Sequence, residues 1–79
     1  MADTKLARIV RMKRAHDKLS QRELAEQIGV GRKTVLRVEN GRQLTTLAAE
    51  KFEKWLDISA ERIVQLAKEP AVEPVKESA

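Results

Sequence analysis

Apolar residues recur along this chain at intervals of three and four positions, the spacing that places side chains on one face of a helix. The segments with this pattern cover about residues 5–16, 20–28, 32–39 and 46–56, and a last one follows Ser59. No stretch alternates apolar and polar residues for long enough to predict a strand. The pattern therefore predicts an all-α protein, a compact bundle of about five helices.

The apolar stripes of these segments supply the expected core. Trp55 is interpreted as a core residue, with a dimer interface, where tryptophan is enriched, as the alternative. The residues expected to face inward are Leu6, Ile9, Val10, Leu24, Ala25, Ile28, Val35, Val38, Ala48, Phe52, Trp55, Leu56, Ile63, Leu66 and Ala67.

Local signals mark the ends of the second and third helices. Ser20 and Glu23 have the spacing of a capping box, which satisfies the free amides at a helix start. Gly29 can end the second helix because glycine adopts a positive φ without steric cost. Asn40 and Gly41 form a similar stop signal after the third helix. The segment between Ser20 and Gly41 therefore predicts two short helices joined by a tight turn.

The length of 79 residues leaves room for one small domain. We expect this domain to span residues 1–68. Residues 69–79 contain both prolines of the chain and several charges. With little to bury, they are expected to form a disordered tail.

The composition argues against several classes of site. The chain has no cysteine and one histidine, so neither a disulfide nor a metal site is expected, and no cofactor or small-molecule ligand is evident. The longest apolar runs are only a few residues, so no transmembrane helix or signal peptide is predicted and a cytoplasmic location is expected. No catalytic triad or phosphate-binding glycine loop is visible, so an enzyme is not expected.

The charge is unevenly distributed along the chain. The net charge is +4; residues 1–46 hold eleven basic and five acidic residues, whereas residues 47–79 hold five basic and seven acidic ones. A basic half indicates a polyanionic partner on one face, and an ordinary solvated surface is the alternative.

The third predicted helix separates its residues into two faces. On a helical wheel, Val35 and Val38 lie together and are expected to pack on the second helix. The opposite arc of about 140° carries three cations and a leucine: Arg32, Lys33, Arg37 and Leu36. A short helix with a packed back and a cationic front fits the major groove of DNA.

The same segment resembles a known family. The residues that carry the resemblance are Leu19-Ser20-Gln21-x-x-Leu24-Ala25-x-x-Ile28-Gly29-Val30 and then Val35-x-x-Val38-Glu39-Asn40-Gly41. This pattern is similar to the helix-turn-helix of lambda-repressor-like proteins, which include phage repressors and Cro proteins. The resemblance covers about residues 5–66. It implies a compact bundle of about five helices that binds double-stranded DNA.

The resemblance also implies residue roles. Arg32, Lys33 and Arg37 match positions that read base edges. Leu36 is a further candidate, because its apolar side chain could contact a thymine methyl group. The alternative is that Leu36 is an exposed leucine without a role in binding.

Other positions match contacts outside the base edges. Gln21 and Arg42 match phosphate contacts, and Thr34 and Thr46 are added as candidates for the DNA backbone. Arg14 and Glu39 match an ion pair that ties the first helix to the end of the third. One departure from the family pattern is Gly31, which stands where a serine or threonine cap is common.

These expectations combine into a functional hypothesis. The chain is expected to be a sequence-specific transcriptional regulator, acting as a repressor on a palindromic operator and dimerising through its fourth and fifth helices. One alternative is a phage or plasmid regulator that acts mainly through a protein partner, such as an antitoxin or a recombination directionality factor. A third hypothesis is a nucleic-acid binder without sequence preference.

Overall fold

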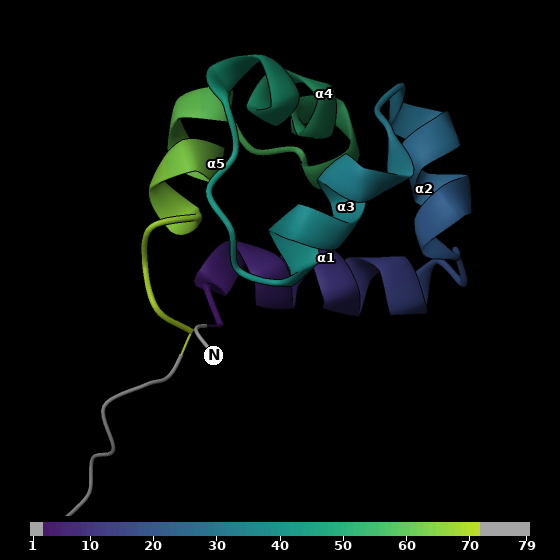
Figure 1. Cartoon of the computed structure of the whole chain (residues 1–79), viewed down its shortest axis with the longest axis horizontal. Helices are drawn as coiled ribbons and strands as arrows, with labels where there is room; N and C mark the ends of the chain where they lie inside the picture. Colours follow the sequence, from purple (N-terminus) through teal and green to yellow (C-terminus); the bar gives the residue numbers. More distant parts are fainter. Residues whose placement is uncertain (1–2, 72–79) are drawn as a thin grey trace, which may run out of the picture.

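The computed structural model describes residues 3–71 and, over that range, confirms the all-α prediction. Its helices are α1 (Lys5–His16), α2 (Gln21–Ile28), α3 (Arg32–Glu39), α4 (Thr46–Leu56) and α5 (Ala60–Leu66). In Figure 1, α1 runs along the base, α2 and α5 stand at its two ends, α4 lies at the top and α3 occupies the centre. Packing is closest between α4 and α5, between α2 and α3, and between α1 and α3.

Side-chain caps explain where most of these helices begin. The hydroxyl groups of Thr4, Ser20, Thr45 and Ser59 each accept a hydrogen bond from a backbone amide in the first turn of the helix that follows. Ser20 also completes the predicted capping box, because its own amide donates to Glu23 Oε1 at 2.8 Å. The helix α3 differs, since Gly31 has no side chain with which to cap it.

The turn between α2 and α3 depends on the conformation of Gly29. Its φ of 80° and ψ of 38° lie in the left-handed region, and its amide donates to the Ala25 carbonyl. Glycine occupies this region without the steric cost that a Cβ imposes. The chain therefore reverses sharply after α2, and α3 packs against α2, in which Ala25 is 3% exposed.

The core lies between the five helices and has Phe52 as its largest fully buried side chain. The prediction that Ala48 faces inward was wrong, because Ala48 is half-buried whereas its neighbour Ala49 is fully buried. Ala49, Phe52 and Leu56 are spaced three and four positions apart and form the inner face of α4. Three residues expected in the core are only half-buried and pack at its margin: Ile9, Ile28 and Trp55.

The two ends of the described chain pair with each other. The Lys5 amide donates to the Glu69 carbonyl, and the Ala71 amide donates to the Asp3 carbonyl, both at 2.9 Å. Thr4 and Pro70 form an isolated antiparallel bridge between these bonds. Ala71 is 4% exposed. The expectation of a disordered tail therefore fails for residues 69–71, and the remainder of that expected tail lies outside the described residues.

Candidate nucleic-acid interface

The outer face of α3 is cationic, and its inner face is closely packed. Val35 and Val38 are 0% and 1% exposed, which fixes the helix against the core. The four residues predicted to read bases are all exposed: Arg32, Lys33, Leu36 and Arg37. Within residues 3–71, no carboxylate lies at ion-pair distance from any of the three cations. This face can therefore pair with an external anion without first breaking an internal ion pair.

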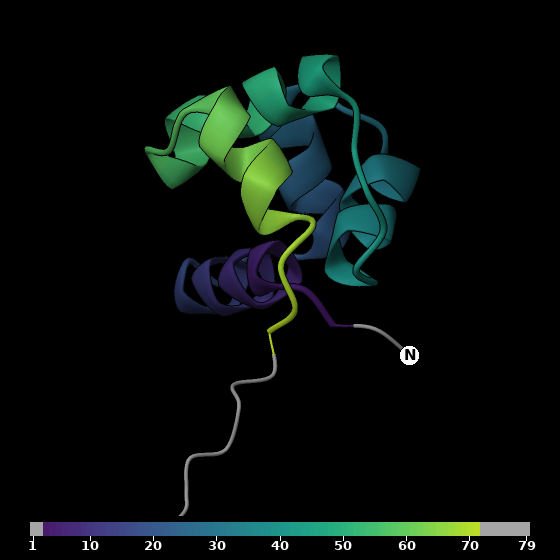
Figure 2. The same ribbon diagram turned by 90° about the vertical axis from the view of Figure 1, so that its left-hand side faces the viewer.

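The segment that follows α3 extends the same side of the molecule. Figure 2 shows α3 and residues 40–45 along one side of the bundle, with the turn between α4 and α5 on the other. Arg42 and Thr46 are exposed, and Thr34 is half-buried. The Arg42 amide donates to the Arg37 carbonyl at 3.0 Å, which keeps the start of this segment close to the last turn of α3.

The C-terminal end of α3 is joined to α1 by an ion pair. Arg14 donates from Nε to Glu39 Oε2 at 2.6 Å and from Nη2 to Oε1 at 3.0 Å, in a bidentate arrangement. The Glu39 side chain is 4% exposed, and its hydrogen bond raises the pKa of Arg14 above the ordinary value. Arg14 also donates to the Leu19 carbonyl at 2.9 Å, so one guanidinium links α1, the start of α2 and the end of α3.

Gln21 takes part in the same cluster. Its Nε2 donates to Glu39 Oε1 at 3.0 Å, and its side chain is half-buried. A glutamine amide has two N–H donors, so one of them remains for a second acceptor. Arg22, the next residue, is exposed and has no ion-pair partner among the described residues. It is a basic candidate that the sequence analysis had not singled out.

This geometry agrees with the comparison against known families. A family model described as helix-turn-helix matches residues 10–63, which include α2, α3 and α4 in full. The chain belongs to the helix-turn-helix family. The resemblance to lambda-repressor-like proteins is thereby confirmed, and the chain is a DNA-binding transcription regulator of a family that is not typically enzymatic. No curated protein matches the chain.

A second arginine holds the C-terminal end of α3 in this helix-turn-helix protein. Arg11 donates from Nη1 to the Glu39 carbonyl at 2.7 Å and from Nη2 to the two Asp3 carboxylate oxygens at 3.0 and 2.9 Å. The hydrogen bond from Arg11 lowers the pKa of Asp3. Sequence analysis had treated Arg11 only as part of the basic half. No local signal could have identified its role, because its partners lie 8 and 28 positions away.

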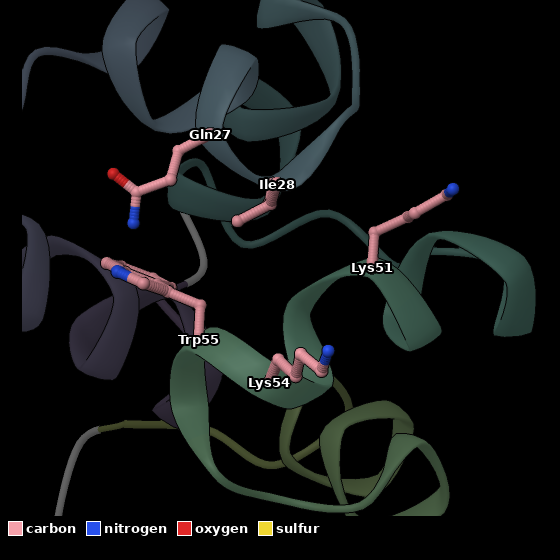
Figure 3. Close-up of a pocket in the computed structure, with 5 residues that line it drawn as sticks. All are labelled: Gln27, Ile28, Lys51, Lys54 and Trp55. Carbon is pink, nitrogen blue, oxygen red and sulfur yellow. The ribbon is translucent and has the colours of Figure 1, made fainter.

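Trp55 lies at a pocket outside the α3 face of the helix-turn-helix. Its ring is tilted against Phe52, with centroids 6.4 Å apart, and Lys13 Nζ lies 5.4 Å from the ring centroid. Its indole Nε1 is buried without a hydrogen-bond partner. Figure 3 shows the open pocket that this side chain lines with four residues of α2 and α4: Gln27, Ile28, Lys51 and Lys54. Trp55 is therefore a marginal core residue that also contributes to the surface.

Residues 3–71 contain no group of three or more histidine, cysteine, aspartate or glutamate side chains that could hold a metal ion. Over the same residues, no helix has both the length and the apolar character that a membrane span requires.

Proposed function

We propose that this regulator is a repressor that recognises a specific duplex sequence by placing α3 in the major groove. The observation that carries the proposal is the exposed face of α3, where Arg32, Lys33 and Arg37 have no internal acid partner. An arginine guanidinium matches the O6 and N7 acceptors of guanine, and each such pair discriminates by about 1–3 kcal/mol. Leu36 lies on the same face at 38% exposure, and we assign it to a thymine methyl group.

The flanking residues are proposed to hold this helix against the DNA backbone. Phosphate contacts fix orientation and register without reading sequence. The residues assigned to this role are Gln21, Thr34, Arg42 and Thr46. Exposure of Arg42 and Thr46 supports the assignment, whereas Gln21 would contact phosphate while remaining bonded to Glu39.

We further propose that the protein binds a palindromic operator as a symmetric dimer through α4 and α5. Leu47 on α4 is 68% exposed, and its burial in an interface would remove an apolar side chain from water. A dimer doubles the contacts of a module that reads only a few base pairs, with half-sites about 34–36 Å apart. Occupation of such a site blocks other proteins from it, which is the simplest route to repression.

Selection from a random duplex library tests this function, followed by fluorescence anisotropy of the selected duplex and a scrambled one at two salt concentrations. We expect a palindromic sequence bound at least about a thousandfold more tightly than scrambled DNA. Equal binding to both duplexes, with strong salt dependence, would identify a nonspecific binder and reject the proposal.

Two substitutions separate base reading from phosphate contact. Arg37→Ala should weaken binding to the selected duplex about 5- to 150-fold and relax the preference at one base position. Arg42→Ala should weaken binding to all sequences alike and reduce the salt slope by about one. Lys68→Ala is the matched control, since it removes one exposed charge that lies outside α3, α4 and α5 and has no ion-pair partner within residues 3–71.

The Trp55 pocket favours a second candidate function, a regulator that acts mainly through a protein partner such as an antitoxin or a recombination directionality factor. Lys51 and Lys54 at its rim have no ion-pair partner among the described residues. Co-expression with the product of the neighbouring reading frame tests this candidate. A complex that forms with the unmodified chain but not with Trp55→Ala would favour it over direct repression.

A further inference from the structure

The C-terminal end of α3 is held through its backbone as well as through the Glu39 side chain. The last carbonyl groups of a helix lack partners within the helix and carry partial negative charge. Arg11 on α1 supplies a guanidinium N–H to one of them, the Glu39 carbonyl, at 2.7 Å. A cation at this position is favourable both as a hydrogen-bond donor and through the helix dipole.

The Arg11 side chain is itself oriented by Asp3. An arginine side chain loses considerable rotamer freedom when it is fixed in one place, and the Arg11 side chain is 41% exposed. The two carboxylate oxygens of Asp3 accept from Nη2 at 3.0 and 2.9 Å, which leaves Nη1 directed at Glu39. Without Asp3, the guanidinium would be free to turn into solvent.

Asp3 is in turn held by the pairing of the chain ends. Its carbonyl accepts from the Ala71 amide at 2.9 Å, and the neighbouring Lys5 amide donates to Glu69. Thr4, between them, is 7% exposed and caps α1. A continuous series of contacts therefore runs from Ala71 through Asp3 and Arg11 to Glu39 at the end of α3.

The two proposed DNA contacts nearest to Glu39 depend on this end of the helix. Arg37 lies two residues before Glu39, and Arg42 lies three residues after it. The Arg42 amide donates to the Arg37 carbonyl at 3.0 Å, so the backbone around Glu39 links the two positions. A displacement of Glu39 would move both side chains relative to a bound duplex.

We propose that Asp3 and Arg11 are positioning residues for DNA binding, which act by fixing the C-terminal end of α3. The inference rests on the proposed function, because it concerns the α3 face that is assigned to DNA. Neither residue is proposed to contact DNA: both Nη1 and Nη2 of the Arg11 guanidinium donate hydrogen bonds within the protein.

The decisive variant is Asp3→Ala, because a charge effect and a positioning effect predict opposite changes in DNA affinity. Removing an acid from a protein that binds a polyanion should tighten binding if only charge matters. Loss of positioning should instead weaken binding to the selected duplex about three- to tenfold. Glu26→Ala is the matched control, because it removes an exposed acid on α2 that has no ion-pair partner within residues 3–71 and lies outside the proposed dimer interface. The control should bind as tightly as the unmodified chain or more tightly.

Arg11→Lys supplies a second comparison at constant charge. A lysine keeps the positive charge but cannot bridge two acceptors with a planar fork. We expect it to weaken binding as much as Asp3→Ala while leaving the salt slope unchanged. The proposal would be overturned if Arg11 contacted a phosphate directly. In that case the salt slope would be smaller for Arg11→Ala than for Arg11→Lys, and Asp3→Ala would bind the selected duplex as tightly as the unmodified chain.

Amide hydrogen exchange by NMR distinguishes positioning from a general loss of stability. In Asp3→Ala, the amides of Asn40, Gly41 and Arg42, which bond into the last turn of α3, should exchange faster. The amides of Ile63 and Ala67 in the α5 region should not. Equal acceleration everywhere, or binding like that of the control, would overturn the positioning role. Failure of the unmodified chain to prefer any duplex would instead reject the proposed function.

Discussion

The two ends of α3 are held in very different ways. At the C-terminal end, Glu39 is buried and receives hydrogen bonds from Arg14, Gln21 and Arg11. At the N-terminal end, Gly31 provides no side-chain cap, and the first residue of the helix, Arg32, is exposed. The same short helix thus has one end fixed by three side chains and one end fixed only by its turn and by apolar packing.

This contrast shows which end of α3 is fixed in place by side-chain hydrogen bonds. Hydrogen-bonded charged groups fix the C-terminal end relative to α1 and α2, so the backbone near Arg37 has little freedom. An end without a cap leaves its amides for water or for an acceptor on a ligand. We therefore expect Arg37 to be presented in a more defined orientation than Arg32 and Lys33.

The largest loss of stability is expected from removing the ion pair that fixes the C-terminal end of α3. Arg14→Ala would leave the Glu39 carboxylate, 4% exposed, with Gln21 as its remaining side-chain donor, and should destabilise the fold by about 2–3 kcal/mol. Urea unfolding measures this change. Arg8→Ala on the exposed side of α1 is the control and should change stability by less than about 0.5 kcal/mol. Similar losses in both variants would mean that the ion pair has no special role.

A smaller loss of stability is expected from a change at Gly29, in the turn before the uncapped N-terminal end of α3. Gly29 has a φ of 80°, and a Cβ added there would meet no atom within 4 Å. Gly29→Ala should therefore destabilise through backbone strain alone, by about 1–2 kcal/mol. Thermal unfolding of the variant measures the effect. An unchanged melting temperature would show that the turn adapts to a Cβ.

A gain in stability is expected from adding a cap at the N-terminal end of α3. Gly31 has φ −76° and ψ 153°, close to the −77° and 167° of the capping residue Ser20. A Cβ at Gly31 also meets nothing within 4 Å. Gly31→Ser should add the missing cap and restrict the unfolded chain, stabilising the fold by about 0.5–1 kcal/mol. A loss of stability in chemical denaturation would contradict this reading of the two ends.

The smallest change in stability is expected from lowering the pH. The folded pKa values of Asp3, Asp17 and Glu69 are lowered, chiefly by hydrogen bonds from Arg11, His16 and Lys5 respectively. Groups with lowered pKa values bind protons more readily in the unfolded chain, so stability is retained above the ordinary values of 3.8 and 4.5 and falls as pH decreases through them.

Denaturation midpoints measured between about pH 6 and 3 test this prediction. Asp3→Asn should make the dependence on pH slightly shallower, because it removes one of the three carboxyl groups with a lowered pKa. Stability that rises on acidification would have the wrong sign.

The sequence alone determined the features that depend on neighbouring residues. Helix ends follow from local chemistry, such as the Ser20 hydroxyl at a first turn and the left-handed Gly29 after a last one. The period of apolar residues placed Val35 and Val38 inward and the cations of α3 outward. The pairing of Arg14 with Glu39 came from family resemblance rather than from any local rule.

Only the tertiary structure decided the features that depend on distant contacts. Ala49 rather than Ala48 faces the core because the packing of α4 on α5 sets the rotation of that helix. The prolines and charges of residues 69–79 predicted disorder throughout, yet Glu69 and Ala71 find backbone partners at the other end of the chain. Nothing in the sequence indicated that Arg11 is more than a surface charge, whereas in the folded chain it donates hydrogen bonds to Asp3 and to the Glu39 carbonyl. Hydrogen bonds across 28 positions leave no local pattern, because their partners become neighbours only when the helices pack.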